Sequence, residues 1–69
     1  MIISNLPVVM AQHRIRTLQE LHRRTGIARS TLTSLYYGKG EAVRFSTLET
    51  LCGFFNVGVG DLLFFKGEN

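Results

Sequence analysis

Hydrophobic residues recur every three or four positions along most of the chain, which is the pattern of amphipathic helices. A first helix is predicted over residues 6–13, with Leu6, Val9, Met10 and His13 on one stripe. Asn5 stands where a side chain can cap this helix, and Pro7 falls in the first turn, where its missing N–H costs little.

Two further helices are predicted on either side of Gly26. Thr17-Leu18-Gln19-Glu20 is a capping box, which predicts a helix that begins there and runs to about Thr25. Gly26 can adopt the left-handed conformation that ends a helix. The next helix is predicted over residues 29–37 and is closed by Gly38, with an inward face of Leu32, Leu35 and Tyr36.

In the remaining third of the chain, the pattern predicts one helix and one stretch that can be either helical or extended. Ser46-Thr47-Leu48-Glu49 is a second capping box, and the helix that it starts stops at Asn56 after an apolar stripe of Leu48, Leu51, Cys52 and Phe55. A short helical turn is expected over residues 59–63, whereas residues 63–65 can instead be extended and pair with Ile2-Ile3. The expected fold is therefore all-α, with one compact domain over residues 1–69 and five helices. A short strand pair between the two ends of the chain is the alternative for residues 63–65.

Composition places the chain among small globular domains, and charge indicates a partner. The 69 residues are 45% hydrophobic and 19% charged, which is typical of a folded domain with little core to spare for a catalytic cavity. Residues 1–45 hold seven basic and two acidic side chains, a net charge of +5, whereas residues 46–69 have a net charge of −2. This asymmetry suits a polyanionic partner on one side of the molecule.

Several classes of protein are disfavoured by what the sequence lacks. No apolar run approaches the ~20 residues that span a bilayer, and the first residues do not resemble a signal peptide, so a cytoplasmic location is expected. The one cysteine excludes an internal disulfide, and Cys52, His13 and His22 lack the spacing of a zinc site. Without paired carboxylates, a Cys–His or Ser–His arrangement or a phosphate-binding glycine loop, neither enzyme activity nor any metal or cofactor is expected.

The two helices around Gly26 carry the main functional signal. A tight glycine turn sets such helices at a steep angle, so the second can project into a DNA major groove about 12 Å wide. Its exposed face holds one arginine and several small hydroxyl residues, whereas an ordinary solvated face is richer in glutamate and lysine. Arg29 can make a bidentate contact to guanine. The exposed positions are Arg29, Ser30, Thr33, Ser34 and Tyr37.

The same segment resembles a known family. The chain is similar to the Cro and phage-repressor type of helix-turn-helix, the lambda-repressor-like or XRE family. The similarity is carried by residues 17–21, by Thr25-Gly26-Ile27-Ala28-Arg29 and by the run from there to Gly38-Lys39. Residues 47–52 and 60–63 are similar to the closing helices of short bacterial members. The resemblance implies a five-helix fold with four base-reading residues, Arg29, Ser30, Thr33 and Ser34, and phosphate contacts from Thr17, Gln19, Tyr37, Lys39 and Arg44.

Two positions depart from the family pattern. His22 stands where the motif helices cross and a small residue is usual, so either a wider crossing angle or an outward-pointing ring is expected. Ala28 stands where a serine commonly caps the recognition helix, and the loss of such a cap typically costs ~1 kcal/mol.

A single module of this kind reads only a few base pairs, so a homodimer on a palindromic site is expected. The C-terminal apolar segment is the candidate dimer interface, because adjacent Phe64 and Phe65 cannot both face one core; the predicted interface residues are Val59, Leu62, Phe64 and Phe65. The predicted function is a sequence-specific double-stranded DNA-binding transcriptional regulator, taken to be a repressor. The alternative is a protein-interaction module of the same fold, such as an antitoxin or inhibitor. No effector domain fits in the length, so no small-molecule effector is expected.

Overall fold

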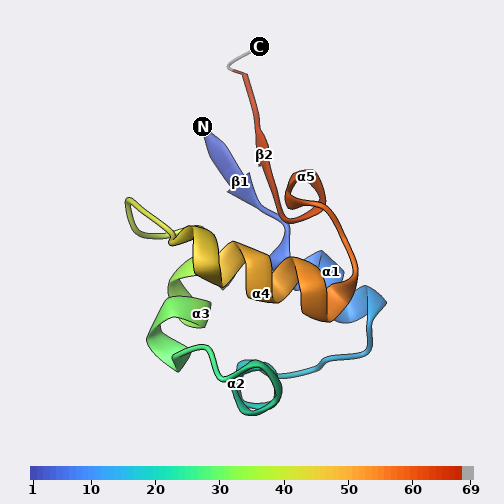
Figure 1. Cartoon of the computed structure of the whole chain (residues 1–69). Helices are drawn as coiled ribbons and strands as arrows, with labels where there is room; N and C mark the ends of the chain where they lie inside the picture. The colour runs from blue at the N-terminus through green and yellow to red at the C-terminus, as the bar shows by residue number, and fades with distance from the viewer. Residues whose placement is uncertain (68–69) are drawn as a thin grey trace.

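The computed structural model describes residues 1–67, which form five helices and a small two-stranded antiparallel sheet (Figure 1). The all-α prediction is confirmed, and the terminal strand pair that the sequence left open is present. The helices are α1 (Leu6–Gln12), α2 (Leu18–Thr25), α3 (Arg29–Tyr36), α4 (Phe45–Phe55) and α5 (Val59–Leu62), and the strands are β1 (Ile2–Ser4) and β2 (Leu63–Phe65).

The core is formed by the apolar stripes of the helices. Each helix contributes at least one nearly inaccessible side chain, and Ile15 adds another from the linker between α1 and α2. His13, which was predicted on the stripe of α1, is exposed instead and lies just beyond the end of the helix. Its ring packs on that of Phe55 at a centroid separation of 4.9 Å, and its Nδ1 lies 2.9 Å from the carbonyl oxygen of Val9. The core residues are Leu6, Val9, Met10, Ile15, Leu21, Leu32, Leu35, Leu51, Phe55 and Leu62.

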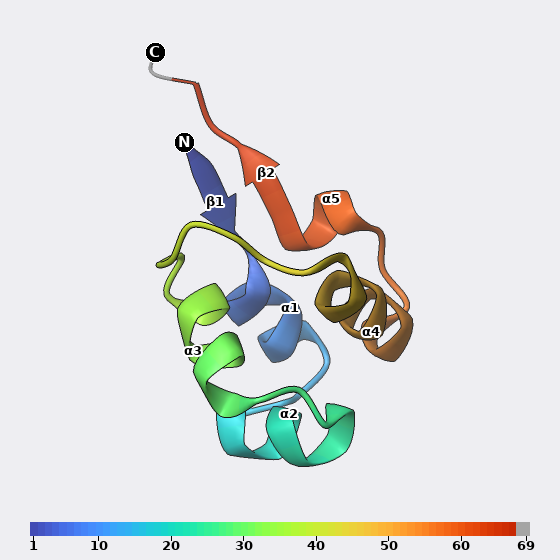
Figure 2. The ribbon, with the colours of Figure 1, turned by 60° about the vertical axis from the view of Figure 1, so that its left-hand side comes forward.

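The sheet joins the two ends of the chain. Ile2 pairs with Phe65 and Ile3 with Phe64, in antiparallel register. Backbone hydrogen bonds continue the ladder on both sides: the N–H of Lys66 donates to the carbonyl of Met1 at 2.8 Å, and the N–H of Asn5 to that of Leu62 at 2.7 Å. We call this sheet, residues 2–4 with 63–65, the ribbon. Figure 2 shows that it projects from the helices, at the end of the molecule opposite α2.

Most of the predicted helix ends are confirmed. The Thr17 hydroxyl accepts a hydrogen bond from the N–H of Glu20 at 3.0 Å, as a capping residue does. Gly26 ends α2 with φ +77° and Asn56 ends α4 with φ +56°, both left-handed as expected. Gly26 and Asn56 therefore set the positions at which α2 and α4 end.

Two predicted caps are wrong. Asn5 is at the N-cap position of α1, but its side-chain amide donates to the backbone carbonyl of Asp61 at 3.1 Å and so ties α1 to α5. The Ser46 capping box does not form, because α4 already begins at Phe45 with Arg44 at its N-cap. Thr47 lies in the first turn of α4 and is buried at 9% exposure.

Candidate nucleic-acid interface

The helix-turn-helix is formed by α2, residues 26–28 and α3, and side chains hold its turn. The Thr25 hydroxyl donates to the carbonyl of Leu21 at 2.7 Å and accepts from the N–H of Ile27 at 3.3 Å. The half-buried ring of His22 donates from Nδ1 to the carbonyl of Ile27 at 2.6 Å. His22 is therefore accommodated by a hydrogen bond to the turn, which neither of the two expectations for this position had included.

One face of α3 is buried and the other is free, as the sequence predicted. Leu32 is fully buried and Leu35 is 9% exposed, and both belong to the core. The opposite side is exposed and forms the surface that we call the reading face: Arg29, Ser30, Thr33 and Ser34. Ala28 is the N-cap of α3 and supplies no side-chain hydrogen bond, which confirms the departure noted in the sequence.

Arg29 and Gln19 are linked across the two motif helices. The Nη1 group of Arg29 donates a hydrogen bond to the Oε1 atom of Gln19, although the residues are ten positions apart. The bond leaves the other N–H groups of the guanidinium free to reach a base edge. It also leaves the amide N–H2 of Gln19 free to donate to a phosphate. Gln19 therefore both orients Arg29 and keeps a donor of its own.

The loop between α3 and α4 borders one flank of the reading face. A hollow of about 240 Å³ is lined by Ser30 and Ser34 on one side and by loop residues that include Lys39 and Val43 on the other. The N–H of Lys39 donates to the carbonyl of Ser34 at 2.8 Å, so the start of the loop is fixed to the end of α3. The Lys39 side chain is exposed there.

The remaining predicted phosphate contacts lie at the ends of helices. Tyr37 directly follows α3, is 64% exposed and packs edge-on against Tyr36 at 4.9 Å. Arg44 is exposed at the N-cap of α4, and Thr17 is exposed at the N-cap of α2. These three residues are therefore on the surface, each at the end of a helix.

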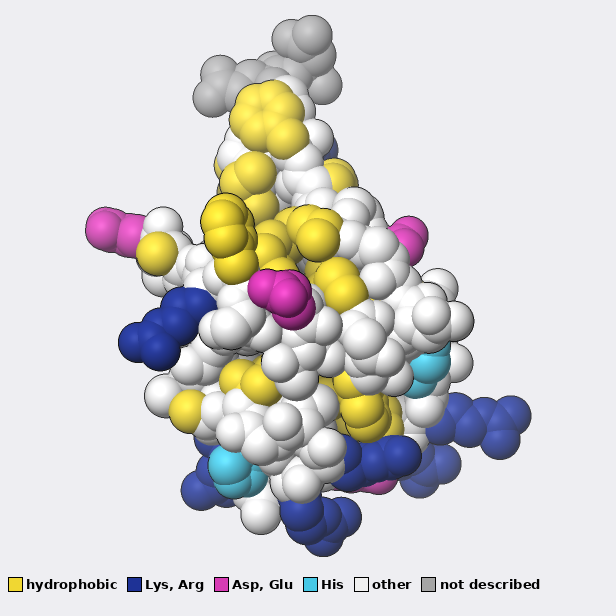
Figure 3. All heavy atoms as spheres, in the orientation of Figure 1, with side chains coloured by type: hydrophobic (Ala, Val, Ile, Leu, Met, Phe, Trp, Pro, Cys, Tyr) yellow, Lys and Arg dark blue, Asp and Glu magenta, His cyan; other side chains and the backbone are white. Residues whose placement is uncertain are grey.

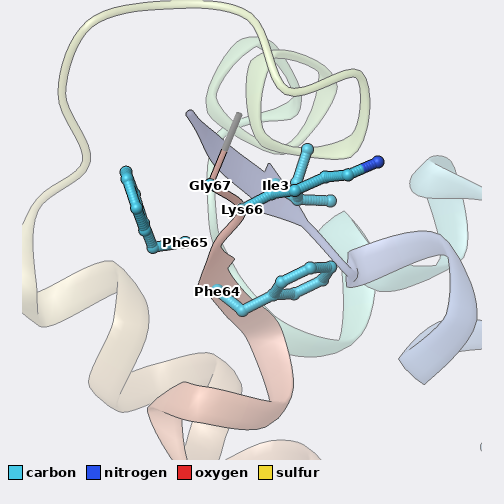
Figure 4. Close-up of a pocket in the computed structure, with 5 residues that line it drawn as sticks. All are labelled: Ile3, Phe64, Phe65, Lys66 and Gly67. Atoms are coloured by element: carbon cyan, nitrogen blue, oxygen red, sulfur yellow. The ribbon is translucent and has the colours of Figure 1, made fainter. Parts of the chain in front are cut away.

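The surface divides into a basic end and an apolar end. In Figure 3, lysine and arginine side chains gather around the end of the molecule where α2 lies, and hydrophobic side chains gather around β2. Figure 4 shows Phe64 and Phe65 pointing to opposite sides of β2. Their exposed fractions are 45% and 73%, and that of Val59 is 51%. Leu62 is 1% exposed and belongs to the core, so of the four predicted interface residues it offers no surface to a partner.

Sequence reasoning missed several surface residues. Phe45 has the highest exposed fraction, 82%, of the large hydrophobic side chains that the structure describes. It begins α4, whose start the sequence placed two residues too late. Arg14 and Arg16 were counted as charges only, and they lie together beside Tyr36 in a hollow of about 500 Å³.

Known proteins identify the class to which this geometry belongs. The chain matches the model of the Cro/C1-type HTH DNA-binding domain over residues 5–68 and belongs to that family, which is one of DNA-binding domains and not of enzymes. It is similar to an uncharacterised HTH-type transcriptional regulator of Bacillus subtilis (strain 168), YozG, at 36% identity over 67 residues, which are 97% of this chain and 79% of the relative. No solved structure matches the chain.

No helix among residues 1–67 is long and apolar enough to cross a membrane. Within the same part of the chain, no three His, Cys, Asp or Glu side chains are grouped so that they can hold a metal ion.

Proposed function

We propose that this chain is a single-domain, cytoplasmic transcriptional regulator that binds double-stranded operator DNA as a homodimer and represses the genes beside it. The observation that carries the proposal is the reading face: α3 turns its apolar side to the core and leaves Arg29, Ser30, Thr33 and Ser34 exposed. The family of DNA-binding domains and the name of the Bacillus subtilis relative, a transcriptional regulator, support it.

The reading face carries the sequence specificity in this proposal. Arg29 contacts guanine O6 and N7, which is the commonest specific contact in the major groove. Ser30, Thr33 and Ser34 are small, so the backbone of α3 can approach the base edges closely. Gln19 holds Arg29 at the N-terminal end of α3, where a recognition helix contacts bases.

Contacts to the DNA backbone position the domain without specifying sequence. Lys39 and Arg44 contribute charge on the side of the α3–α4 loop, and Tyr37 contributes its hydroxyl at the end of α3. Thr17 and Gln19 stand at the start of α2, where free backbone N–H groups favour an anion. Neutralised phosphates make the affinity fall steeply with salt concentration.

The ribbon is the proposed homodimer interface. Phe65 and Ile2 share one face of it, since they are paired across the strands, and both are exposed, at 73% and 60%. A second copy that covers this face removes apolar surface from water and brings two reading faces to successive half-sites. Val59 on α5 and Phe64 on the opposite side of β2 are also exposed, whereas Leu62 supports the ribbon from the core.

Selection of bound duplexes from a random pool tests the proposal. We expect the wild-type protein to enrich a palindromic site with guanine at a fixed position in each half. Arg29→Ala should relax the preference at that position and lower the discrimination there by ~1–3 kcal/mol. Lys39→Ala is the control, because loss of a phosphate contact should weaken all sequences alike. A pool that remains random with the wild type would contradict sequence-specific binding.

The apolar ribbon also supports the alternative of a protein-interaction module. In that case a partner of different sequence, such as a toxin, covers Phe65 and Ile2. Such a module would be monomeric when pure, would not enrich a DNA site and would bind its partner equally well with or without Arg29.

A further inference from the structure

We propose that Arg14 and Arg16, in the linker between α1 and α2, form a second binding site for the DNA backbone, on the flank of α3 away from the α3–α4 loop. The inference rests on the proposed DNA binding and extends it to residues for which the family resemblance implied no role.

Arg14 occupies a position that usually belongs to glycine. Two backbone hydrogen bonds end α1, from Ile15 N–H to the carbonyl of Met10 at 2.9 Å and from Arg14 N–H to that of Ala11 at 3.1 Å. These are the two bonds of a Schellman motif, in which the residue in the place of Arg14 is left-handed and is usually glycine or asparagine. Arg14 has φ +59°. A residue with a Cβ atom adopts this conformation at a cost, and non-glycine residues held in it cluster at functional sites.

The linker directs both arginines to the surface. Ile15, between them, is 4% exposed and is part of the core, whereas Arg14 and Arg16 are both exposed. The two arginines line one hollow of about 500 Å³ together with Pro7, Met10 and Tyr36. Tyr36 is the last residue of α3, so this hollow reaches the recognition helix itself.

No acidic partner accounts for these two arginines within residues 1–67. The ion pair in this part of the chain is Arg24 with Glu20, at 3.7 Å on α2. Arg24 also lies over the ring of Phe54, 5.2 Å from its centroid, so its role is to connect α2 with α4. Arg14 and Arg16 remain as positive charge that the fold does not neutralise, beside the start of α2.

The geometry of the major groove explains why a second flank is needed. A helix with its side chains is about 10–12 Å wide and fills a groove about 12 Å wide, so a phosphate backbone runs along each side of it. The α3–α4 loop borders one side of α3, where Lys39 and Ser34 line a common hollow. The linker reaches the start of α2 directly below α3 (Figure 2), and its hollow includes Tyr36. Arg14 and Arg16 therefore supply the charge that faces the other backbone.

Fluorescence anisotropy on a random-sequence duplex across a salt series tests the site. We compare the wild type with Arg14→Gly, Arg16→Gln and the double variant. Each lost phosphate contact should reduce the slope of log K against log salt by ~0.9, so a dimer should lose ~1.8 in each single variant and ~3.6 in the double variant. At 0.1 M salt this corresponds to about an order of magnitude in affinity for each contact. Arg23→Gln is the matched control, since it removes one exposed charge from the last turn of α2.

Arg14→Gly separates binding from folding. Glycine suits a φ of +59°, so this variant should keep or raise the melting temperature while it binds DNA more weakly. An Arg14 that served only the C-terminus of α1, where cations are favoured, would give an unchanged salt slope. Unchanged slopes in both Arg14→Gly and Arg16→Gln, or an equal loss in Arg23→Gln, would overturn the proposal while leaving the reading face intact. A wild type that binds no DNA would overturn it together with the proposed function.

Discussion

Replacing Phe65 by serine tests the ribbon as a homodimer interface, and the structure gives the size of the expected effect. Phe65 is 73% exposed, its strand neighbour across the ribbon is Ile2, and its ring points away from Phe64 (Figure 4). A phenylalanine side chain offers ~200 Å² of apolar surface, so the exposed part amounts to about 150 Å² in each copy. At ~25 cal/mol per Å², burying it in both copies stabilises the dimer by at most ~7 kcal/mol.

A second copy that covers only part of the Phe65 ring gives less than this limit. We therefore expect Phe65→Ser to lower the free energy of dimerisation by about half of the limit, ~3–4 kcal/mol. Since ~1.4 kcal/mol corresponds to a factor of ten, Phe65→Ser should weaken dimerisation by a factor of more than ~100. Sedimentation equilibrium over a concentration series measures the dissociation constant, and far-UV circular dichroism checks that the monomer remains folded. Val8→Ser is the matched control, because Val8 is 47% exposed on α1, outside the ribbon. The same dimer constant in Phe65→Ser and wild type, or an equal loss in Val8→Ser, would refute the assignment.

Three substitutions test the hydrogen bonds that stabilise the ends of α2 and α3 and the turn between them. The free energy of unfolding is measured for each by urea denaturation. Thr17→Ala removes the hydroxyl that accepts from Glu20 N–H and should lower the unfolding free energy by ~1 kcal/mol; no change would mean that the cap contributes nothing. Ala28→Ser supplies the side-chain cap that α3 lacks and should raise the unfolding free energy by up to ~1 kcal/mol, whereas a loss would show that serine does not fit there. His22→Ala leaves the carbonyl of Ile27 without its donor and should cost ~1–3 kcal/mol; a stability equal to wild type would assign that carbonyl to water.

Local signals predicted the helix-turn-helix well because its ends are determined by neighbouring residues. The hydroxyl of Thr17 needs only an N–H three residues further on, and Gly26 needs only its own freedom to become left-handed. The burial of Leu32 against the exposure of Arg29 follows from helical periodicity alone. These are the features that define the reading face, so the candidate site was largely accessible from sequence.

Contacts between residues far apart in the sequence determine the helix caps and the strand pairing that local signals did not predict. Ser46-Thr47-Leu48-Glu49 has the same capping pattern as the segment at Thr17, but Thr47 is buried and α4 starts earlier, so the motif does not act as a cap. Asn5 likewise donates to Asp61, 56 residues away, instead of capping α1. The ribbon depends on pairing between the two ends of the chain, which no local window contains.

Contacts between distant residues also determine which apolar side chains remain on the surface. Apolar character alone did not distinguish Leu62, which α5 directs into the core, from Phe64 and Phe65, which β2 leaves exposed. The unusual conformation of Arg14 is also invisible in sequence, because it follows from the way in which α1 ends above Ile15.

Binding of the wild-type protein to a random-sequence duplex across a salt series shows whether the surface around α3 binds DNA. Seven residues are proposed to contact phosphates in each protomer, with Arg14 and Arg16 included, and charged contacts from Lys39 and Arg44 alone give four per dimer. We expect the affinity to fall steeply with salt, with a log–log slope steeper than about −3.6 for those four contacts. Absence of binding even at low salt, or an affinity that does not change with salt, would mean that this surface does not bind the DNA backbone.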